Sequence, residues 1–273
     1  MKAIHLNPRE LQLQQLLLDV AAYADKAHDR VDAEPLVLRW AGGWVRDKLL
    51  GIDSHDIDTA INSMTGYPFA EKMREFCDVP ENAQKHQILP HDIGSLHKVA
   101  ANPDKSKHLE TATIKLFGIE VDFVNLRKET YADDSRNPQM EFGTAEEDAL
   151  RRDATVNALF YNLHTGEVED FTTGLSDMEG KLIKTPLEPL QTFMDDPLRV
   201  LRLVRFATRL RFTIDPAAEH VMGDNKVLDA LKLKISRERV GIEVEKMLKG
   251  MCSTKVRLLA LRPAKWGLRK PPK

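Results

Sequence analysis

The sequence predicts an α+β fold, in which a mixed β-sheet with helices is followed by an all-helical region. Short apolar runs alternate with turn residues between about residues 36 and 175, which is typical of strands. After Asp177 these runs give way to long stretches with helical periodicity. The chain of 273 residues is also longer than one small domain usually needs, so we expect two compact units.

The expected elements follow in chain order. Apolar residues at helical spacing predict a helix over residues 9–27. Strands are expected at residues 36–41, 57–61, 111–117, 119–126, 157–162 and 168–171, and short helices at 45–50 and 69–76. The polar segment 86–108 predicts a long mobile loop. Two further helices are expected over residues 197–212, with Asp196 as the cap and Pro197 in the first turn, and over residues 236–249.

The composition fits a soluble globular protein, with 42% hydrophobic and 30% charged residues. No apolar run approaches the roughly 20 residues of a membrane span, and the N-terminus lacks a secretory signal pattern. Cys77 and Cys252 lie far apart without metal-ligand spacing, which favours reduced thiols in a cell interior. We expect the cytoplasm, with the nucleus and mitochondrion as open alternatives.

A pair of glycines follows the first predicted strand, in the segment Gly42-Gly43-Trp44-Val45-Arg46-Asp47. Glycines between a strand and a helix let the backbone turn sharply and approach a ligand closely. The first N–H groups of the following helix attract anions such as a triphosphate, and Arg46 could hold phosphate oxygens from one turn further on. Taken alone, the pattern fits equally a tight turn with Arg46 and Asp47 paired at the surface.

Two acids open the next predicted strand. Residues two apart in a strand point to the same side, so Asp56 and Asp58 present both carboxylates to one face, with Ile57 behind them. Such close carboxylates repel each other unless a cation compensates, and magnesium prefers one or two carboxylates with phosphate oxygens and water. Two such ions can hold the attacking and leaving oxygens of an in-line displacement. After the glycine turn, the pair predicts a nucleotidyl-transfer site that uses Mg²⁺.

A third carboxylate is expected from residues 119–124. Glu120 and Asp122 share one face there if Val121 and Phe123 are buried. We favour Asp122, which would bind the metal near the attacking hydroxyl or act as its base.

These motifs resemble the class II tRNA nucleotidyltransferases, relatives of DNA polymerase beta. Besides Gly-Gly-x-Val-Arg-Asp and Asp-x-Asp, four later segments match that family's pattern in order, namely Arg151–Leu159, Gly174–Asp177, Asp195–Arg202 and Ile235–Arg239. The resemblance covers about residues 36–250, and the matching sequence is similar to that of eukaryotic, especially fungal, members. It implies a polymerase-beta-like head at 31–175 and an all-α neck at 176–250 that recognises the base. The helix expected from periodicity forms a separate N-terminal segment at 1–30.

The resemblance also implies the residues that bind the incoming nucleotide. Gly43 and Arg46 would hold the triphosphate. Arg152, Asp153 and Asn157 would contact the sugar and phosphates, and the last two, four residues apart, would share a helix face or flank a turn.

Base recognition would fall to Asp196 and Arg199. A carboxylate accepts from an exocyclic amine, and arginine donates to a ring nitrogen or carbonyl. Uracil and guanine present other edges and would leave these groups unpaired, which is costly in a closed pocket. Arg202 and Arg205 continue the same helical spacing and would hold the phosphates.

The implied reaction is template-independent addition of C and A to the 3′ end of tRNA from CTP and ATP, with release of pyrophosphate. A CC-only or A-only adding enzyme, a poly(A) polymerase of the same family, and a truncated non-catalytic nucleotide- or RNA-binding remnant stay open. Family members usually continue with helical regions that grip the tRNA elbow, so we expect a chain truncated after the neck. Residues 251–273 form an atypical basic tail with seven Lys or Arg and no acid, which either binds phosphates or is unstructured.

Overall fold

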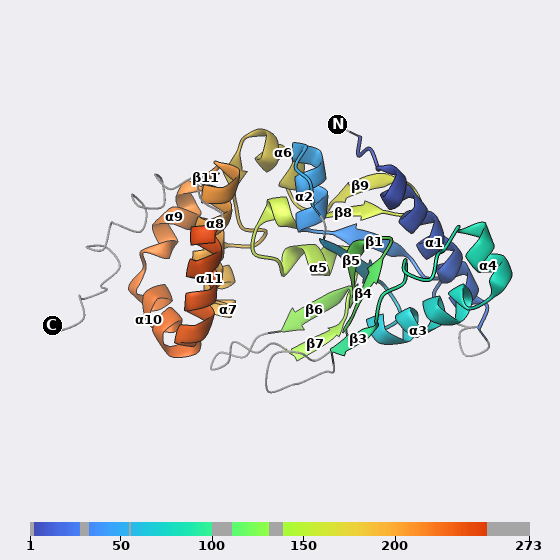
Figure 1. The fold of residues 1–273 in the computed structure, drawn as a ribbon. Coiled ribbons are helices and arrows are strands. Elements are labelled where there is room, and N and C mark those ends of the chain that lie inside the picture. Colours follow the sequence, from blue (N-terminus) through green and yellow to red (C-terminus); the bar gives the residue numbers. More distant parts are fainter. Residues whose placement is uncertain (1–2, 28–32, 55, 100–110, 131–138, 250–273) are drawn as a thin grey trace. The chain divides into compact units, whose positions relative to one another are not determined.

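The computed structural model describes residues 3–27, 33–54, 56–99, 111–130 and 139–249 (Figure 1). Its contacts divide the chain into two compact units. Of the described residues, the first unit contains those up to 130 together with 139–149 and 157–171, and the second contains 150–156 and 172–249. The predicted basic tail at 251–273 lies outside the described residues. The domain boundaries near residues 31, 176 and 251 therefore stay predictions.

The first unit is built on a seven-stranded sheet with the strand order β3-β4-β5-β2-β1-β8-β9. Its strands are β1 (Leu38–Ala41), β2 (Asp56–Ile61), β3 (His97–Val99), β4 (Thr111–Leu116), β5 (Ile119–Asn125), β8 (Leu159–Asn162) and β9 (Glu167–Asp170). β2 and β5 are parallel, and all other neighbours in this sheet are antiparallel. A separate antiparallel pair consists of β6 (Arg127–Thr130) and β7 (Gln139–Phe142). The predicted mixed sheet is thus confirmed.

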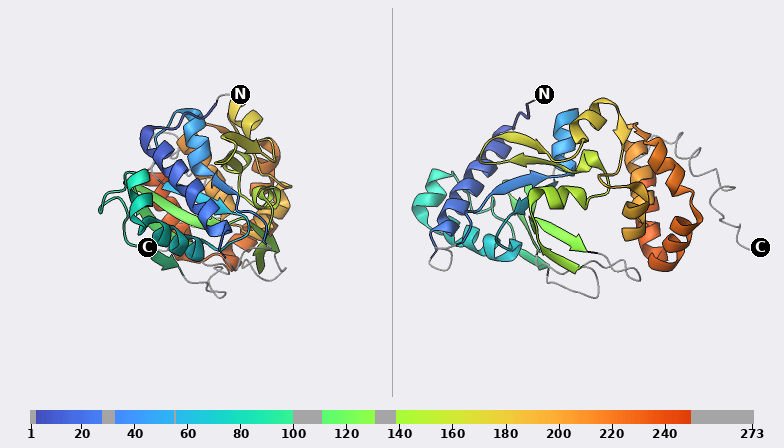
Figure 2. Two further views of the ribbon diagram at one scale, coloured as in Figure 1. Left: turned by 90° about the vertical axis from the view of Figure 1, so that its right-hand side faces the viewer. Right: turned by 180° about the vertical axis from the view of Figure 1, so that it is seen from behind.

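Two helices, α1 (Pro8–Asp25) and α3 (Gly66–Cys77), lie side by side over one face of this sheet (Figures 1 and 2). The residues that β2 and β5 turn toward this face, among them Ile57, Val121 and Phe123, are buried. α1 begins with a capping box, in which the Asn7 side chain accepts from the Glu10 N–H and the Glu10 carboxylate accepts from the Asn7 N–H. The predicted helix over residues 9–27 is therefore confirmed.

Three shorter helices complete the first unit. α2 (Gly43–Leu50) follows β1 directly, α4 (Pro80–Lys85) follows α3, and α5 (Ala145–Leu150) follows β7. α5 packs on the second face of the sheet through small residues, and the buried cluster there consists of Ala41, Ala60, Leu126, Ala145, Ala149, Ala158 and Phe160. Small side chains let the helix approach the strands closely. This contact decides which part of that face stays open.

The second unit is helical apart from one short strand pair. Its helices are α6 (Gly174–Glu179), α7 (Pro189–Asp195), α8 (Arg199–Leu210), α9 (Pro216–Met222), α10 (Asn225–Lys234) and α11 (Arg237–Lys249). The strands β10 (Leu182–Ile183) and β11 (Thr213–Ile214) pair in parallel. The expectation of an all-helical region misses this pair, because two residues per strand are too few to produce an alternating pattern. None of the helices in the described residues combines the length and apolar character that crossing a membrane requires.

The prediction of one long loop over residues 86–108 holds for residues 86–96, which form no helix or strand apart from one isolated bridge, and is wrong for residues 97–99. His97–Val99 forms the edge strand β3, and Ile93 bridges to Leu116. Two of the three residues of this edge strand, His97 and Lys98, are polar and exposed, so the strand shows no apolar alternation. His86, expected in this loop, is buried at the end of α4, where its ring lies 2.8 Å from a carboxylate oxygen of Asp19. Residues 100–110 lie outside the described residues.

Candidate active site

The predicted acids lie on one face of the sheet. The parallel register of β2 and β5 places Asp58 opposite Asp122 and Asp56 opposite Glu120. Directly opposed residues of neighbouring strands project to the same side, and residues two apart on a strand do so as well. The register therefore gathers four carboxylates on one face. Asp56, Asp58 and Glu120 are exposed and Asp122 is half-buried.

This face is open only at one end of the strands. Ala60 lies two residues after Asp58 on the same side of β2 and is buried under α5, with Ala145 and Ala149 in the same cluster. Asp56 and Asp58, at the beginning of β2, lie beyond this cover and remain exposed. α5 therefore leaves uncovered the end of the sheet that carries the acids.

Asp122 receives a hydrogen bond that the sequence did not predict. The hydroxyl of Thr113 on β4 donates to the carboxylate of Asp122, and the two residues are opposite each other in the β4–β5 register. A hydroxyl donor stabilises the ionised carboxylate and fixes its orientation. Thr113 precedes Asp122 by nine residues, and only the hairpin register brings them together, so a sequence motif had no means of indicating this partner.

The acids do not by themselves form a closed cage for a metal ion. Within the described part of the chain, no group of three or more His, Cys, Asp or Glu side chains converges closely enough to hold one. Like charges on one face repel each other, and Thr113 holds the Asp122 carboxylate. A site for a hard divalent ion needs only one or two carboxylates when phosphate oxygens and water supply the other ligands. Asp56 and Asp58, exposed and on the same side, fit that requirement.

The glycine turn lies at the same end of the sheet as the acids. Ala41, the last residue of β1, is opposite Asp58, and the turn follows at once. Gly42 has φ 69° and ψ −120°, which an L side chain rarely adopts. A Cβ added at Gly43 would lie 3.6 Å from Arg46 Nη2, an ordinary contact. The sharp turn thus requires Gly42, whereas Gly43, the residue predicted as a phosphate ligand, is half-buried at the first position of α2.

Arg46 is buried and bound to side chains of its own unit. Its Nε donates to Asp47 Oδ1 at 2.8 Å, Nη2 lies 2.7 Å from the same oxygen, and Nη1 donates to Asn157 Oδ1. The alternative of an Arg46–Asp47 pair is correct in the pairing and wrong in its location at the surface, because both residues are only 3% exposed. This arrangement fixes Arg46 and Asn157 relative to each other at the start of α2.

The residues predicted to contact the sugar do not share a helix. Asp153 precedes the 3₁₀ turn Thr155–Asn157, whose last residue is Asn157, and the two belong to the second and first unit respectively. Of the two alternatives left by the sequence, a common helix face is therefore wrong. Arg152 is half-buried in the second unit, two residues before Ala154. Asp153 is buried and accepts from Arg202 Nε at 2.5 Å.

The predicted phosphate-binding arginines of α8 are both engaged in ion pairs. The Asp153 carboxylate raises the pKa of Arg202, although burial opposes this. Arg205 Nε donates to Glu243 Oε2 at 2.7 Å. Glu243 lies on α11, is 3% exposed and also stands 3.9 Å from Arg202 Nη1. Glu243, for which no role was predicted, thus joins Arg202 and Arg205 of α8 to α11.

Asp196 and Arg199 flank the start of α8. The Asp196 carboxylate accepts from the Leu198 N–H at 3.1 Å, as a cap does, and lies 3.5 Å from Arg239 Nη2. Arg199 is buried, and its Nη2 donates to the backbone carbonyl of Arg151 at 2.7 Å. Both side chains therefore have fixed positions without a ligand, which is the condition for reading the edge of a base.

Comparison with known proteins places the chain in a family. The profile of the poly A polymerase head domain matches residues 38–184, more than half of the chain. The chain belongs to this family, in the class II tRNA nucleotidyltransferase branch that the sequence motifs indicated. Enzymes of the family generally use a divalent metal.

Two fungal relatives are similar over nearly the whole chain. The chain is 67% identical over 255 residues to nucleotidyltransferase lcsQ of Purpureocillium lilacinum, covering 93% of this chain and 42% of that protein. It is 57% identical over 249 residues to the mitochondrial CCA tRNA nucleotidyltransferase of Saccharomyces cerevisiae, covering 90% and 44%. The chain thus spans less than half the length of these relatives.

The fold is similar to that of solved CCA-adding enzymes. One such structure, an apo form, superposes with a TM-score of 0.72 at 27% identity and covers 96% of this chain and 54% of that chain. A Thermotoga maritima CCA-adding enzyme complexed with tRNA matches with a TM-score of 0.66 at 26% identity, over 96% of this chain and 52% of that chain. The predicted polymerase-beta-like head followed by a helical region is confirmed by this similarity and by the elements described above.

Proposed function

We propose that the chain is the nucleotide-binding and catalytic part of a CCA-adding tRNA nucleotidyltransferase. The observation that carries the proposal is the set of aspartates on the open end of the sheet, beside the strand that leads into the glycine turn. The names of the fungal relatives and the tRNA-bound structure support it. The substrates would be the 3′ end of tRNA, CTP and ATP.

The metal of this site would be Mg²⁺, held by Asp56 and Asp58 with Asp122 beside them. These are hard oxygen donors on one exposed face, and Mg²⁺ prefers such carboxylates together with phosphate oxygens and water. When bound, the ion would neutralise charge on the reacting phosphate.

The reaction would be an in-line displacement at the α-phosphorus of the nucleotide. The RNA 3′ oxygen forms a bond to this phosphorus, the bond to the bridging oxygen breaks, and pyrophosphate leaves. Asp122, oriented by Thr113, would accept or orient the proton of the 3′ hydroxyl. The turn at Gly42 and Gly43 and the N–H groups that open α2 would hold the triphosphate, with the positive charge of Arg46 one turn further on favouring the phosphates.

Base selection would fall to Asp196 and Arg199. The carboxylate accepts from the exocyclic amine shared by cytosine and adenine, and the guanidinium donates to the ring. Asp153 and Arg152 would contact the sugar and phosphates. Arg202 and Arg205, which are held by Asp153 and Glu243, would place their remaining N–H groups toward the phosphates.

The products formed from a tRNA that lacks its CCA end test this proposal. The 273-residue chain is incubated with CTP alone, ATP alone, or both, and the added nucleotides are sequenced. A CCA-adding enzyme gives CC with CTP and CCA with both; a CC-only enzyme never adds A, an A-only enzyme never adds C, and a poly(A) polymerase adds runs of A. Loss of all products in Asp56→Ala with retained folding supports catalysis at the acids, whereas no product from the unaltered chain favours the non-catalytic remnant.

The cellular compartment stays a proposal as well. We propose the cytoplasm, with the mitochondrion as the alternative that a relative's name raises. Fractionation of cells that express the chain from its own locus would decide between them.

A further inference from the structure

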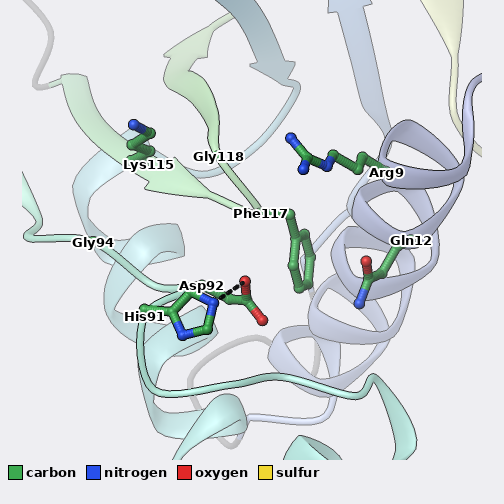
Figure 3. Close-up of a pocket in the computed structure, with 8 residues that line it drawn as sticks. All are labelled: Arg9, Gln12, His91, Asp92, Gly94, Lys115, Phe117 and Gly118. Atoms are coloured by element: carbon green, nitrogen blue, oxygen red, sulfur yellow. Dashed lines mark ion pairs between the residues drawn. The ribbon is translucent and has the colours of Figure 1, made fainter.

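A pocket of the first unit lies beside the proposed active site and is lined by basic side chains. Its volume is about 360 Å³. Arg9 and Gln12 of α1 form one side, Lys115 of β4 the other, and the turn Phe117–Gly118 lies between them (Figure 3). His91 and Asp92 complete the lining. None of these residues takes part in the proposed reaction.

The two cations of the pocket have no acidic partner. Lys115 and Arg9 are exposed, and neither forms an ion pair with any residue that the structure describes. Glu120 is opposite Lys115 in the β4–β5 register without pairing with it. Asp92, the acid of the lining, accepts the Leu89 N–H at 2.8 Å. Two positive charges therefore stay available to an anion.

The local backbone keeps these charges at the edge of the pocket. Gly118 has φ +81°, and a Cβ there would lie 3.4 Å from Arg9 Nη1, so the guanidinium lies against the turn. Gly94 approaches β4 closely, because its N–H donates to the Lys115 carbonyl at 2.8 Å and an added Cβ would lie 3.1 Å from Lys115 Cβ. Close backbone contacts at Gly94 and Gly118 thus fix the part of the pocket wall from which these side chains extend.

The strand register places Lys115 on the face that carries the acids. Lys115 is opposite Glu120, which is opposite Asp56. With neighbouring strands about 4.8 Å apart, the Cα atoms of Lys115 and Asp56 are roughly 10 Å apart. The turn at Phe117 directly precedes β5, so the pocket also lies at the open end of the sheet. One or two nucleotides of single-stranded RNA can span this distance.

The geometry of an in-line displacement indicates which substrate lies near this pocket. In an in-line displacement the attacking and leaving oxygens lie on opposite sides of the phosphorus. The glycine turn follows β1, on one side of the aspartates of β2, and would receive the leaving pyrophosphate. β5 and β4 lie on the other side in the strand order. The attacking RNA strand must then approach over β5 and β4, where Lys115 stands.

We infer that this pocket binds the phosphodiester backbone of the RNA primer, through Lys115 and Arg9, a short distance upstream of the reacting 3′ end. The inference rests on the proposed function for the identity of the RNA. Phosphate contacts of this kind position a strand without reading its sequence, which suits a primer whose last bases change as nucleotides are added.

The test compares RNA binding by Lys115→Ala, Arg9→Ala and the double variant with binding by the unaltered chain. The ligand is a tRNA transcript without its CCA end, followed by fluorescence anisotropy at several salt concentrations. One lost contact to a single strand lowers the salt slope by about 0.7, which is a rise in Kd of about fivefold at 0.1 M salt. The double variant should lose about twice that slope, with KM for CTP unchanged.

Lys72→Ala serves as the matched control. Lys72 is a partly exposed lysine of α3 outside the pocket lining, and it pairs with Glu75 at 2.9 Å. Its removal changes the net charge equally and should leave the Kd for RNA unchanged. Equal weakening by Lys72→Ala, or an effect of the pocket variants on KM for CTP alone, would overturn the inference.

Primers with a single neutral methylphosphonate linkage locate the contact. One linkage near the 3′ end should weaken binding to the unaltered chain and have little further effect on Lys115→Ala, because charge and partner are lost only once. Additive losses at every linkage would contradict the inference. The binding measurements need no turnover, so a chain that adds no nucleotide yet shows this pattern would refute the proposed function and retain the RNA contact.

Discussion

The two glycines of the turn after β1 should respond in opposite ways to the same substitution. Gly42 has φ 69° and ψ −120°, a conformation that costs an L residue about 1–3 kcal/mol. We therefore expect Gly42→Ala to lower the free energy of unfolding by that amount. Gly43 is the first residue of α2, and a Cβ there meets only Arg46 Nη2 at 3.6 Å. Since alanine favours a helix over glycine by about 1 kcal/mol, Gly43→Ala should leave stability unchanged or slightly raised.

Function should separate the two variants in the other direction. If the N–H groups at Gly43 approach the triphosphate closely, a methyl group there should raise KM for CTP while folding is retained. Thermal unfolding and KM for CTP are measured on both variants, and each kcal/mol corresponds to a shift of about 2–4 °C in Tm for a chain of this size. An unchanged Tm for Gly42→Ala, or equal destabilisation by both, would refute the assignment of the strained position to Gly42.

Three further predictions concern single side chains. Thr113→Val removes the hydroxyl that donates to Asp122, a loss of about 1.5 kcal/mol. We therefore expect kcat to fall roughly tenfold and the metal concentration that gives half-maximal activity to rise. Thr113→Ser should restore both values, and an unchanged metal titration for Thr113→Val would argue against a positioning role. Burial raises the pKa of the Cys77 thiol to about 11, so in a Cys252→Ser background iodoacetamide should react at pH 8 only after unfolding, and rapid reaction of the folded chain would contradict this. Burial raises the pKa of Asp19, but the contacts of this carboxylate with Lys85 and His86 outweigh burial and lower the pKa. The stability from these contacts is present above the pKa of Asp19 in the unfolded chain and is lost as the pH falls through its pKa in the folded chain. Asp19→Asn should therefore flatten the acid limb of a Tm-against-pH curve, and an unaltered limb would exclude this contribution.

The strands that form the centre of the sheet were predictable because their residues alternate. Burial of Val121 and Phe123 follows from the same pattern that exposes Glu120. β6, β7 and α5 were missed, since short polar strands and a six-residue helix carry little periodicity. Their existence depends on partners that are distant in sequence, such as the strand residues under α5.

The candidate site was predictable in its residue types but not in its internal contacts. A strand places Asp56 and Asp58 on one side whatever surrounds it. The partners of Arg46 and Arg202, by contrast, are set by tertiary packing. Arg46 contacts Asn157, which is 111 residues away in sequence, and Arg202 contacts Asp153, which is 49 residues away. Sequence spacing had suggested a common helix face for those two partners, and the 3₁₀ turn that ends at Asn157 excludes it.

Binding of Mn²⁺ together with CTP tests the central claim most directly. Electron paramagnetic resonance reports bound Mn²⁺, and the unaltered chain is compared with Asp56→Asn, Asp58→Asn and the control Asp53→Asn, an exposed acid outside the strand. We expect ordered Mn²⁺ that depends on CTP in the unaltered chain and the control, and its loss in the two β2 variants with Tm retained. Equal Mn²⁺ binding by all four chains would contradict the assignment of the metal to these two acids.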